Sequence, residues 1–144
     1  AMNMMQTFIN THPGSPRIKD ATEVIDKCYE KMEMKDYRTA HLYYNLGQYR
    51  AAALAFSDLI NNFPTTEKGD EYKLMVVKSY YKFAQLSIPD KQVERFEKVT
   101  EEYEDFIDRY PDSKLLKSAE EYSKLSKKQI NEIQHEQTAS SAKR

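Results

Sequence analysis

The segment Leu-Ile-Asn-Asn-Phe-Pro-Thr-Thr at residues 59–66 occurs three times in the chain in recognisable form. The copies at residues 8–15 (Phe-Ile-Asn-Thr-His-Pro-Gly-Ser) and 106–113 (Phe-Ile-Asp-Arg-Tyr-Pro-Asp-Ser) align with it without gaps. In order, each copy has a large apolar residue, then Ile, then Asn or Asp, then a polar residue, then an aromatic residue or His, then Pro, and finally small polar residues. The prolines are 51 and 47 residues apart. Internal similarity at this period indicates an array of helical repeats.

Each copy marks the end of one helix and the start of the next. Proline disfavours helical geometry in the residue before it, so we expect helices to end at His12, Phe63 and Tyr110. The small polar residues after each proline can accept hydrogen bonds from the free N–H groups of the next helix. Ser15 followed by Pro16 fits an N-cap with proline at the first helical position.

Between these ends the apolar residues recur at helical spacing, for example from Tyr49 to Phe63 and from Val93 to Tyr110. The residues between Pro16 and Gly47 include no Pro or Gly, which favours one long helix over two helices with a break near residues 34–36. Gly47 is expected to make the tight turn that follows. The pattern predicts helices at residues 2–12, 15–46, 48–63, 67–87, 90–110 and 113–135.

The stretch from Ala40 to Pro64 resembles the tetratricopeptide (TPR) repeat. The small, aromatic, turn and stop positions of that repeat are filled by Ala40, Tyr43, Gly47, Tyr49, Ala52, Phe56 and Pro64. A looser copy runs from about Asp70 to Pro111, with Ala84 where Gly47 stands in the first. The resemblance implies an all-α fold, namely a TPR-like superhelical array of antiparallel helix pairs with one long helix.

We expect a single TPR-like domain over residues 1–136. Residues 2–12 resemble the second helix of a pair whose first helix is missing, so the domain is expected to be truncated on its N-terminal side. Residues 137–144 contain no apolar residue larger than alanine and are predicted to form a disordered tail.

The composition argues against several functional classes. The 144 residues include 22 Lys and Arg against 23 Asp and Glu, so the net charge of −1 provides no bulk attraction to nucleic acid or anionic lipid. The single cysteine, Cys28, excludes an internal disulfide framework and a multi-cysteine metal site. No apolar run approaches the 18 residues typical of a membrane-spanning helix.

No motif for catalysis or cofactor binding emerges either. The histidines at positions 12, 41 and 135 lack metal-binding spacing. Ser79-x-x-Lys82 matches a motif of penicillin-recognising enzymes, but its companion motifs are absent. The acidic cluster at residues 101–105 reads as a solvated helix face. We therefore expect a protein that is not an enzyme and that needs no cofactor or metal.

Several runs resemble BamD-type proteins, the TPR-like lipoproteins of the bacterial outer-membrane β-barrel assembly machinery. These runs are Lys31–Tyr37, Ala40–Tyr44, Gly47–Ala52, Asn62–Thr66 and Ser79–Tyr81. The similarity covers roughly residues 6–110 and corresponds to the C-terminal half of that family. It implies a location on the periplasmic face of the bacterial outer membrane, with a lipid anchor on a cysteine outside this chain as the link to the membrane.

The same resemblance implies a protein-binding scaffold. No nucleic-acid partner is expected, because the net charge is −1 and Glu120 and Glu121 interrupt the lysines near the C-terminus. The expected partners of the scaffold are a periplasmic domain of the integral barrel-assembly protein and other assembly lipoproteins. Two alternatives stay open at this point. The chain could be a generic TPR adaptor of another envelope or cytoplasmic complex, or a TPR domain separated from a catalytic domain.

The repeat pattern also predicts where a partner binds, because the first helix of each pair lines the inner face of such an array. Tyr and Arg are enriched among the residues that anchor interfaces. The alternative for the tyrosines is that they pack in the core. The predicted partner-binding residues are Tyr37, Arg38, His41, Tyr44, Asn45, Lys78, Tyr81 and Lys82.

Overall fold

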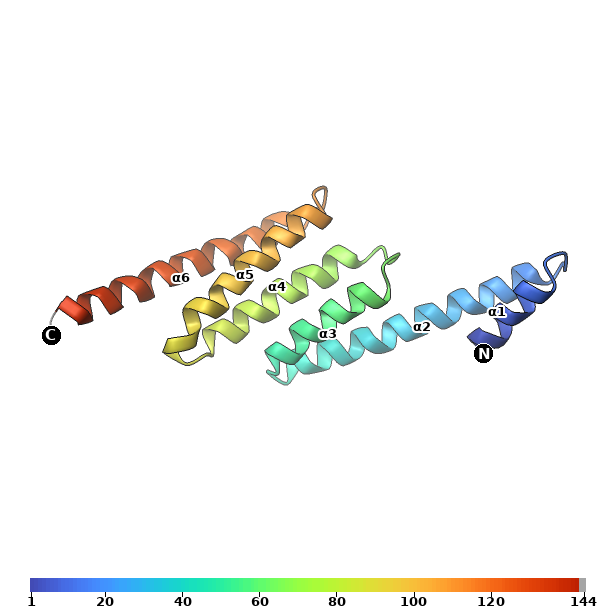
Figure 1. The fold of residues 1–144 in the computed structure, drawn as a ribbon, viewed down its shortest axis with the longest axis horizontal. Coiled ribbons are helices and arrows are strands. Elements are labelled where there is room, and N and C mark those ends of the chain that lie inside the picture. The colour runs from blue at the N-terminus through green and yellow to red at the C-terminus, as the bar shows by residue number, and fades with distance from the viewer. Residues whose placement is uncertain (143–144) are drawn as a thin grey trace. The chain divides into compact units, whose positions relative to one another are not determined.

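A computed structural model describes residues 1–142 as an all-α, TPR-like array, which confirms the predicted fold class. Figure 1 shows its helices: α1 (Met2–Thr11), α2 (Ile18–Asn45), α3 (Tyr49–Asn62), α4 (Gly69–Gln85), α5 (Pro89–Arg109) and α6 (Leu116–Ala142). α2 is one continuous helix, so the alternative of a break near residues 34–36 is wrong. Across the part of the chain that the structure describes, no helix has both the length and the apolar character needed to cross a membrane.

The chain divides into two compact units, Ala1–Arg38 and Thr39–Arg144. The first unit contains α1 and most of α2, and the second contains the end of α2 together with α3 to α6. We expected one domain over residues 1–136, and whether the two units fold as one remains a prediction. α6 continues as an exposed helix through residues 137–142, where a disordered tail was predicted; residues 143 and 144 lie outside the described part.

The three proline loops share one hydrogen-bonding pattern. In each loop the N–H of the residue before proline bonds to the carbonyl four residues earlier, and this ends the helix as predicted. These bonds are His12 to Phe8 (3.0 Å), Phe63 to Leu59 (3.0 Å) and Tyr110 to Phe106 (2.9 Å). The hydroxyl of the Ser or Thr two positions after proline then accepts a hydrogen bond from the backbone N–H two residues further along the chain. The acceptors are Ser15 for Arg17 (3.2 Å), Thr66 for Lys68 (3.2 Å) and Ser113 for Leu115 (3.1 Å).

These loops place the helix starts slightly later than the sequence suggested. Ser15 was expected to be the N-cap, with Pro16 as the first helical residue. Instead Pro16 and Arg17 form a turn, closed by a hydrogen bond of 3.2 Å from the Ile18 N–H to the Ser15 carbonyl, and α2 begins at Ile18.

Gly47 makes the predicted turn between α2 and α3. Its φ of 74° lies in the left-handed region, which glycine adopts without a steric penalty. The Gly47 N–H donates to Tyr44 O (3.0 Å) and the Gln48 N–H donates to Tyr43 O (2.9 Å), which is the Schellman arrangement. Ala84 was aligned with this glycine, but it is fully buried within α4 and makes no turn.

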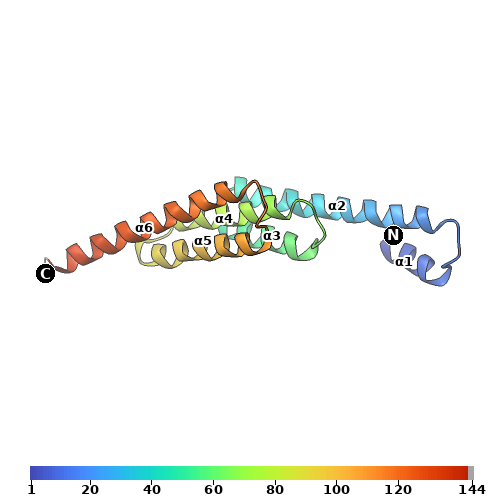
Figure 2. The same ribbon diagram turned by 90° about the horizontal axis from the view of Figure 1, so that it is seen from above.

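The second unit is built from neighbouring helices in two layers. α4 packs against α3, α5 and α6, and α5 also packs against α6. Figure 2 shows α4 and α6 in one layer, with α3 and α5 in the other. The core between the layers includes Val77, Ala84, Phe96 and Val99, none of which is more than 1% exposed. α6 covers this core with partly buried Tyr122, Ile130 and Ile133.

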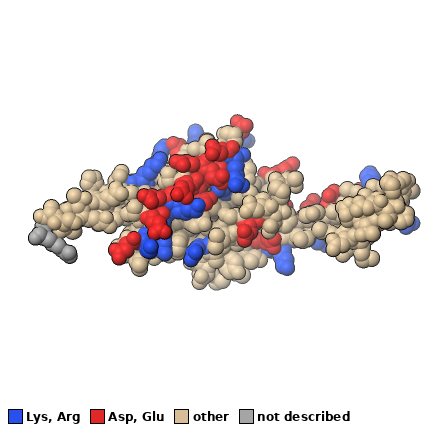
Figure 3. Space-filling model, in the orientation of Figure 1, with Lys and Arg blue, Asp and Glu red and all other residues tan. Residues whose placement is uncertain are grey.

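A buried lysine joins α4 to α5. Lys73 is only 4% exposed, and its ammonium forms ion pairs with Glu102 (2.5 Å) and Asp105. Glu102 also pairs with Lys98 (3.0 Å), and Asp105 pairs with Arg109 (3.0 Å). Acidic and basic side chains gather over α5 in Figure 3, but the inward side of this cluster is not solvated. The interpretation of residues 101–105 as a wholly solvated face is therefore wrong.

The network also sets the protonation of its carboxyl groups. Burial opposes the ionisation of Glu102, but hydrogen bonds from Lys73 and Lys98, together with their charges, lower its pKa below the usual value. For Asp105, burial is again outweighed, here by Lys73 and Arg109, and the pKa is lowered. Both carboxyl groups are thus ionised at neutral pH.

Candidate functional site

Two of the predicted partner-binding residues meet where α2 ends beside α4. The Lys78 ammonium lies 5.3 Å from the centre of the Tyr44 ring, within the range of a cation–π interaction. Tyr44 also makes an edge contact with Tyr49, with ring centres 5.2 Å apart. Both Tyr44 and Lys78 are half-buried, and burial, reinforced by Tyr49, raises the pKa of the Tyr44 hydroxyl. The pair thus presents the Lys78 ammonium, held over an aromatic ring, and the Tyr44 hydroxyl, which stays protonated.

Tyr81 occupies a different environment from the one predicted. It is only 8% exposed and packs against Phe96 of α5 (5.8 Å between ring centres) and Tyr122 of α6 (5.3 Å). Gln85 donates a hydrogen bond of 3.2 Å to its hydroxyl. Tyr81 therefore belongs to the core, and its selection as a partner-binding residue is corrected, because α6 covers the face of α4 on which it lies.

Tyr122 of α6 lies beside Tyr81 and close to the Tyr44–Lys78 pair. It is half-buried, and burial raises the pKa of its hydroxyl, an effect that Lys78 opposes and Tyr44 reinforces. These electrostatic interactions link it to the Tyr44–Lys78 pair. The prediction missed Tyr122, although it is the only Phe, Tyr or Trp in the sequence of α6 and could have been singled out for that reason.

The other predicted residues are divided between the units. His41 is half-buried, and its ring packs edge-on against Phe56 of α3 (5.5 Å), inside the helix pair. Asn45 is exposed and Lys82 is half-buried, both in the second unit. Tyr37 and Arg38 lie in the first unit, so the site in the second unit is described without them. Their role in partner binding remains a prediction.

We give the name Tyr44–Lys78 face to five residues of the second unit for which partner contacts are proposed below: Tyr44, Asn45, Lys78, Lys82 and Tyr122. Its chemistry is that of recognition, since aromatic rings with polar tips and ammonium groups provide contact area and hydrogen bonds. The nearby Ser79 is fully buried and its hydroxyl has no hydrogen-bond partner within residues 1–142, so the Ser79–Lys82 motif offers no accessible nucleophile. In the same residues, no group of three or more His, Cys, Asp and Glu could hold a metal ion.

The fold is thus a TPR-like array of helix pairs, and the Tyr44–Lys78 face lies in its second unit. Comparison with protein families then identifies the group. The family described as "YfiO: Outer membrane lipoprotein" matches residues 1–87, which include the first unit, α3 and α4. The chain belongs to this family of outer-membrane lipoproteins. A search of curated proteins found no match.

The family match bears out the predicted membership of a BamD-like lipoprotein family. The match ends at residue 87, whereas the resemblance was expected to run to about residue 110. That the chain corresponds to the C-terminal half of the family remains a prediction.

Proposed function

We propose that this protein is a non-catalytic scaffold of the bacterial outer-membrane β-barrel assembly machinery and that it binds a periplasmic domain of the barrel-assembly protein. Membership of an outer-membrane lipoprotein family is the observation that carries the proposal. The Tyr44–Lys78 face supports it, because that face offers binding chemistry and the adjoining serine is buried.

Binding would work by surface complementarity. Tyr44 and Tyr122 are held by ring contacts and burial, so ordering them on a partner costs little side-chain entropy. Lys78 and Lys82 follow each other by four residues on α4, which places both ammonium groups on one side of that helix. This arrangement favours a partner surface that carries carboxylates.

The proposal also covers location and further partners. The protein would act on the periplasmic face of the outer membrane, tethered by a lipid on a cysteine outside residues 1–144, and other assembly lipoproteins would join the same complex. A generic TPR adaptor and a TPR domain of a catalytic protein are the rival readings. If either alternative is correct, crosslinking and co-purification from native membranes would not recover the barrel-assembly protein.

The test is crosslinking and co-purification from native membranes with the double variant Lys78→Glu/Lys82→Glu. Each reversed charge at an interface is expected to cost about 1.4 kcal/mol, or about tenfold in affinity, so recovery of the barrel-assembly protein should fall to background. The matched control is Lys114→Glu/Lys117→Glu, which reverses two exposed lysines, one just before α6 and one in its first turn. Undiminished recovery with the first variant, at unchanged helical ellipticity, contradicts the proposal.

A further inference from the structure

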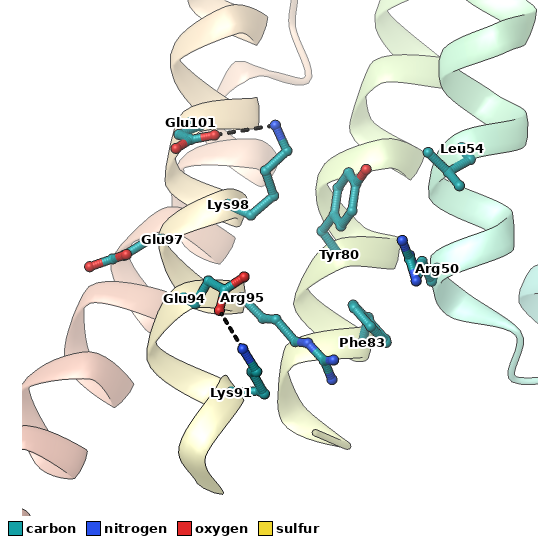
Figure 4. Close-up of a pocket in the computed structure, with 10 residues that line it drawn as sticks. All are labelled: Arg50, Leu54, Tyr80, Phe83, Lys91, Glu94, Arg95, Glu97, Lys98 and Glu101. Carbon is teal, nitrogen blue, oxygen red and sulfur yellow. Dashed lines mark hydrogen bonds and ion pairs between the residues drawn. The ribbon is translucent and has the colours of Figure 1, made fainter. Parts of the chain in front are cut away.

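A hollow lies between α3, α4 and α5, and none of its lining residues belongs to the Tyr44–Lys78 face. Its volume is ≈ 520 Å³, within the range of pockets that take small ligands or a few residues of a peptide. Figure 4 shows Arg50 and Leu54 projecting from α3 on one side, Tyr80 and Phe83 from α4 in the middle, and Arg95 reaching in from α5. We call this hollow the arginine groove.

The positive charges that line the arginine groove are unequally neutralised. Lys91 pairs with Glu94 (3.3 Å), and Lys98 pairs with Glu101 (3.2 Å) and Glu102 (3.0 Å). Within residues 1–142 neither Arg50 nor Arg95 has a carboxylate oxygen within 4.0 Å of its guanidinium nitrogens. The remaining acidic residue of the lining, Glu97, points away from α4 in Figure 4. Two guanidinium groups therefore face the groove without an anionic partner.

Arg95 is held in a defined position. Its Nη1 donates a hydrogen bond of 2.6 Å to the Ser87 hydroxyl, and that hydroxyl in turn donates to the Phe83 carbonyl (2.5 Å). The guanidinium carbon lies 4.2 Å from the centre of the Phe83 ring. An arginine that is fixed in this way uses only part of its donor set, so N–H groups remain for an external acceptor.

The floor of the groove is aromatic and aliphatic. Phe83 and Tyr80 are half-buried, and Leu54 is 49% exposed although it is large and apolar. Burial, reinforced by the charge of Glu102, raises the pKa of the Tyr80 hydroxyl, and the nearby charges of Lys98 and Arg50 oppose the rise. The groove thus combines unpaired guanidinium groups with an apolar surface.

We propose that the arginine groove binds an acidic segment of a partner protein, in which a carboxylate lies next to an aromatic or aliphatic side chain. The carboxylate would accept hydrogen bonds from Arg50 and Arg95, since the planar guanidinium matches a carboxylate through two parallel N–H···O bonds. The neighbouring apolar side chain would cover Leu54 and Phe83. A protein segment fits better than a lipid headgroup because the apolar floor at Leu54 and Phe83 can take a side chain that neighbours the carboxylate.

The test measures fluorescence anisotropy of a labelled peptide, Gly-Asp-Phe-Asp-Gly, with the complete chain. Binding should weaken at least about tenfold for the peptide with Asn in place of Asp, and also for the peptide with Ala in place of Phe. Arg50→Gln should cause a similar loss without unfolding, since Arg50 is exposed and has no ion pair within residues 1–142. Arg95→Gln should act in the same direction, while the control Lys114→Gln/Lys117→Gln should bind as the unchanged protein does.

Two results would overturn the proposal. The first is a loss of the dependence on charge, seen either as equal binding of the Asp and Asn peptides or as full peptide binding by Arg50→Gln. The other is Arg50-dependent binding to phosphatidylglycerol vesicles without binding to the peptide, which would make the groove a lipid site. The Lys78→Glu/Lys82→Glu variant separates this proposal from the proposed scaffold function, because it should leave peptide binding unchanged even where it abolishes capture of the barrel-assembly protein.

Discussion

The buried Lys73 offers the sharpest test of what holds α4 to α5. Its side chain is 6% exposed, whereas the side chains of its partners Glu102 and Asp105 are 14% and 39% exposed. The partners also keep other cations, Lys98 and Arg109, at 3.0 Å. Removing the lysine should therefore cost less than removing its two carboxylates, because only the second change leaves a buried charge without a partner.

The magnitudes follow from this asymmetry. Lys73→Met breaks two charge-assisted contacts but leaves each carboxylate paired, so we expect a loss of about 2 kcal/mol. Glu102→Gln/Asp105→Asn strands the ammonium in the interior, and a buried charge left in this way costs about 3–5 kcal/mol. At about 3 °C per kcal/mol for a chain of this size, the melting temperature should fall by about 6 °C and about 12 °C respectively.

The assay is urea and thermal unfolding followed by far-ultraviolet ellipticity, with the slopes of the urea curves compared to check that the same surface unfolds. Lys91→Met is the control, because its pair with Glu94 is exposed at 52% and 72% and should contribute less than about 1 kcal/mol. A Lys73→Met variant as unstable as the double carboxyl variant, or less stable, would refute the reasoning.

Three further predictions concern turns, helix contacts and pH. Gly47→Ala should destabilise by about 1 kcal/mol in urea unfolding, because φ is 74° there, and a loss below 0.3 kcal/mol in that titration would contradict the Schellman assignment. Gly69→Ala should lower the melting temperature, since an added Cβ would clash with the Tyr110 hydroxyl and would lie 3.0 Å from two carbons of its ring. Adding Tyr110→Phe should restore part of the loss. No rescue by this second change would mean that the hydroxyl is not the obstacle. Stability should fall as the pH drops below about 4.5, because the pKa values of Glu102 and Asp105 are lower in the folded protein than in the unfolded chain. The two carboxylates contribute their full stability above the pKa values of the unfolded chain and lose it as the pH falls through those of the folded protein. A urea midpoint that stays constant between pH 5 and pH 3 would count against the ion network.

Helix order could be predicted from the sequence because proline and glycine act locally. Proline restricts the residue before it, so the ends at His12, Phe63 and Tyr110 followed from the sequence alone. Helix starts were less predictable, since the turn from Ser15 to Ile18 depends on two weak hydrogen bonds that no apolar spacing reveals.

Side-chain placement was harder to predict, because it depends on distant parts of the chain. Tyr81 looked available while only α4 was considered, and the covering by Tyr122 became evident only with α6 in place. Glu102 likewise looked solvated beside its acidic neighbours, because its partner Lys73 lies 29 residues earlier. Helical periodicity assigns a residue to a face, but the packing of another helix decides whether that face is open.

The three proline loops have a consequence for how such a chain can change over time. In each loop the Ser or Thr hydroxyl accepts a local N–H, and in the third loop the Ser113 hydroxyl also donates to the Asp70 carboxylate of α4 (2.5 Å). Substitutions on the helix surfaces can therefore leave the path of the first loop unchanged, whereas the third loop also requires Asp70 on α4. A copy of the third loop placed at another position should preserve the connection fully only where a neighbouring helix also supplies a carboxylate in the place of Asp70.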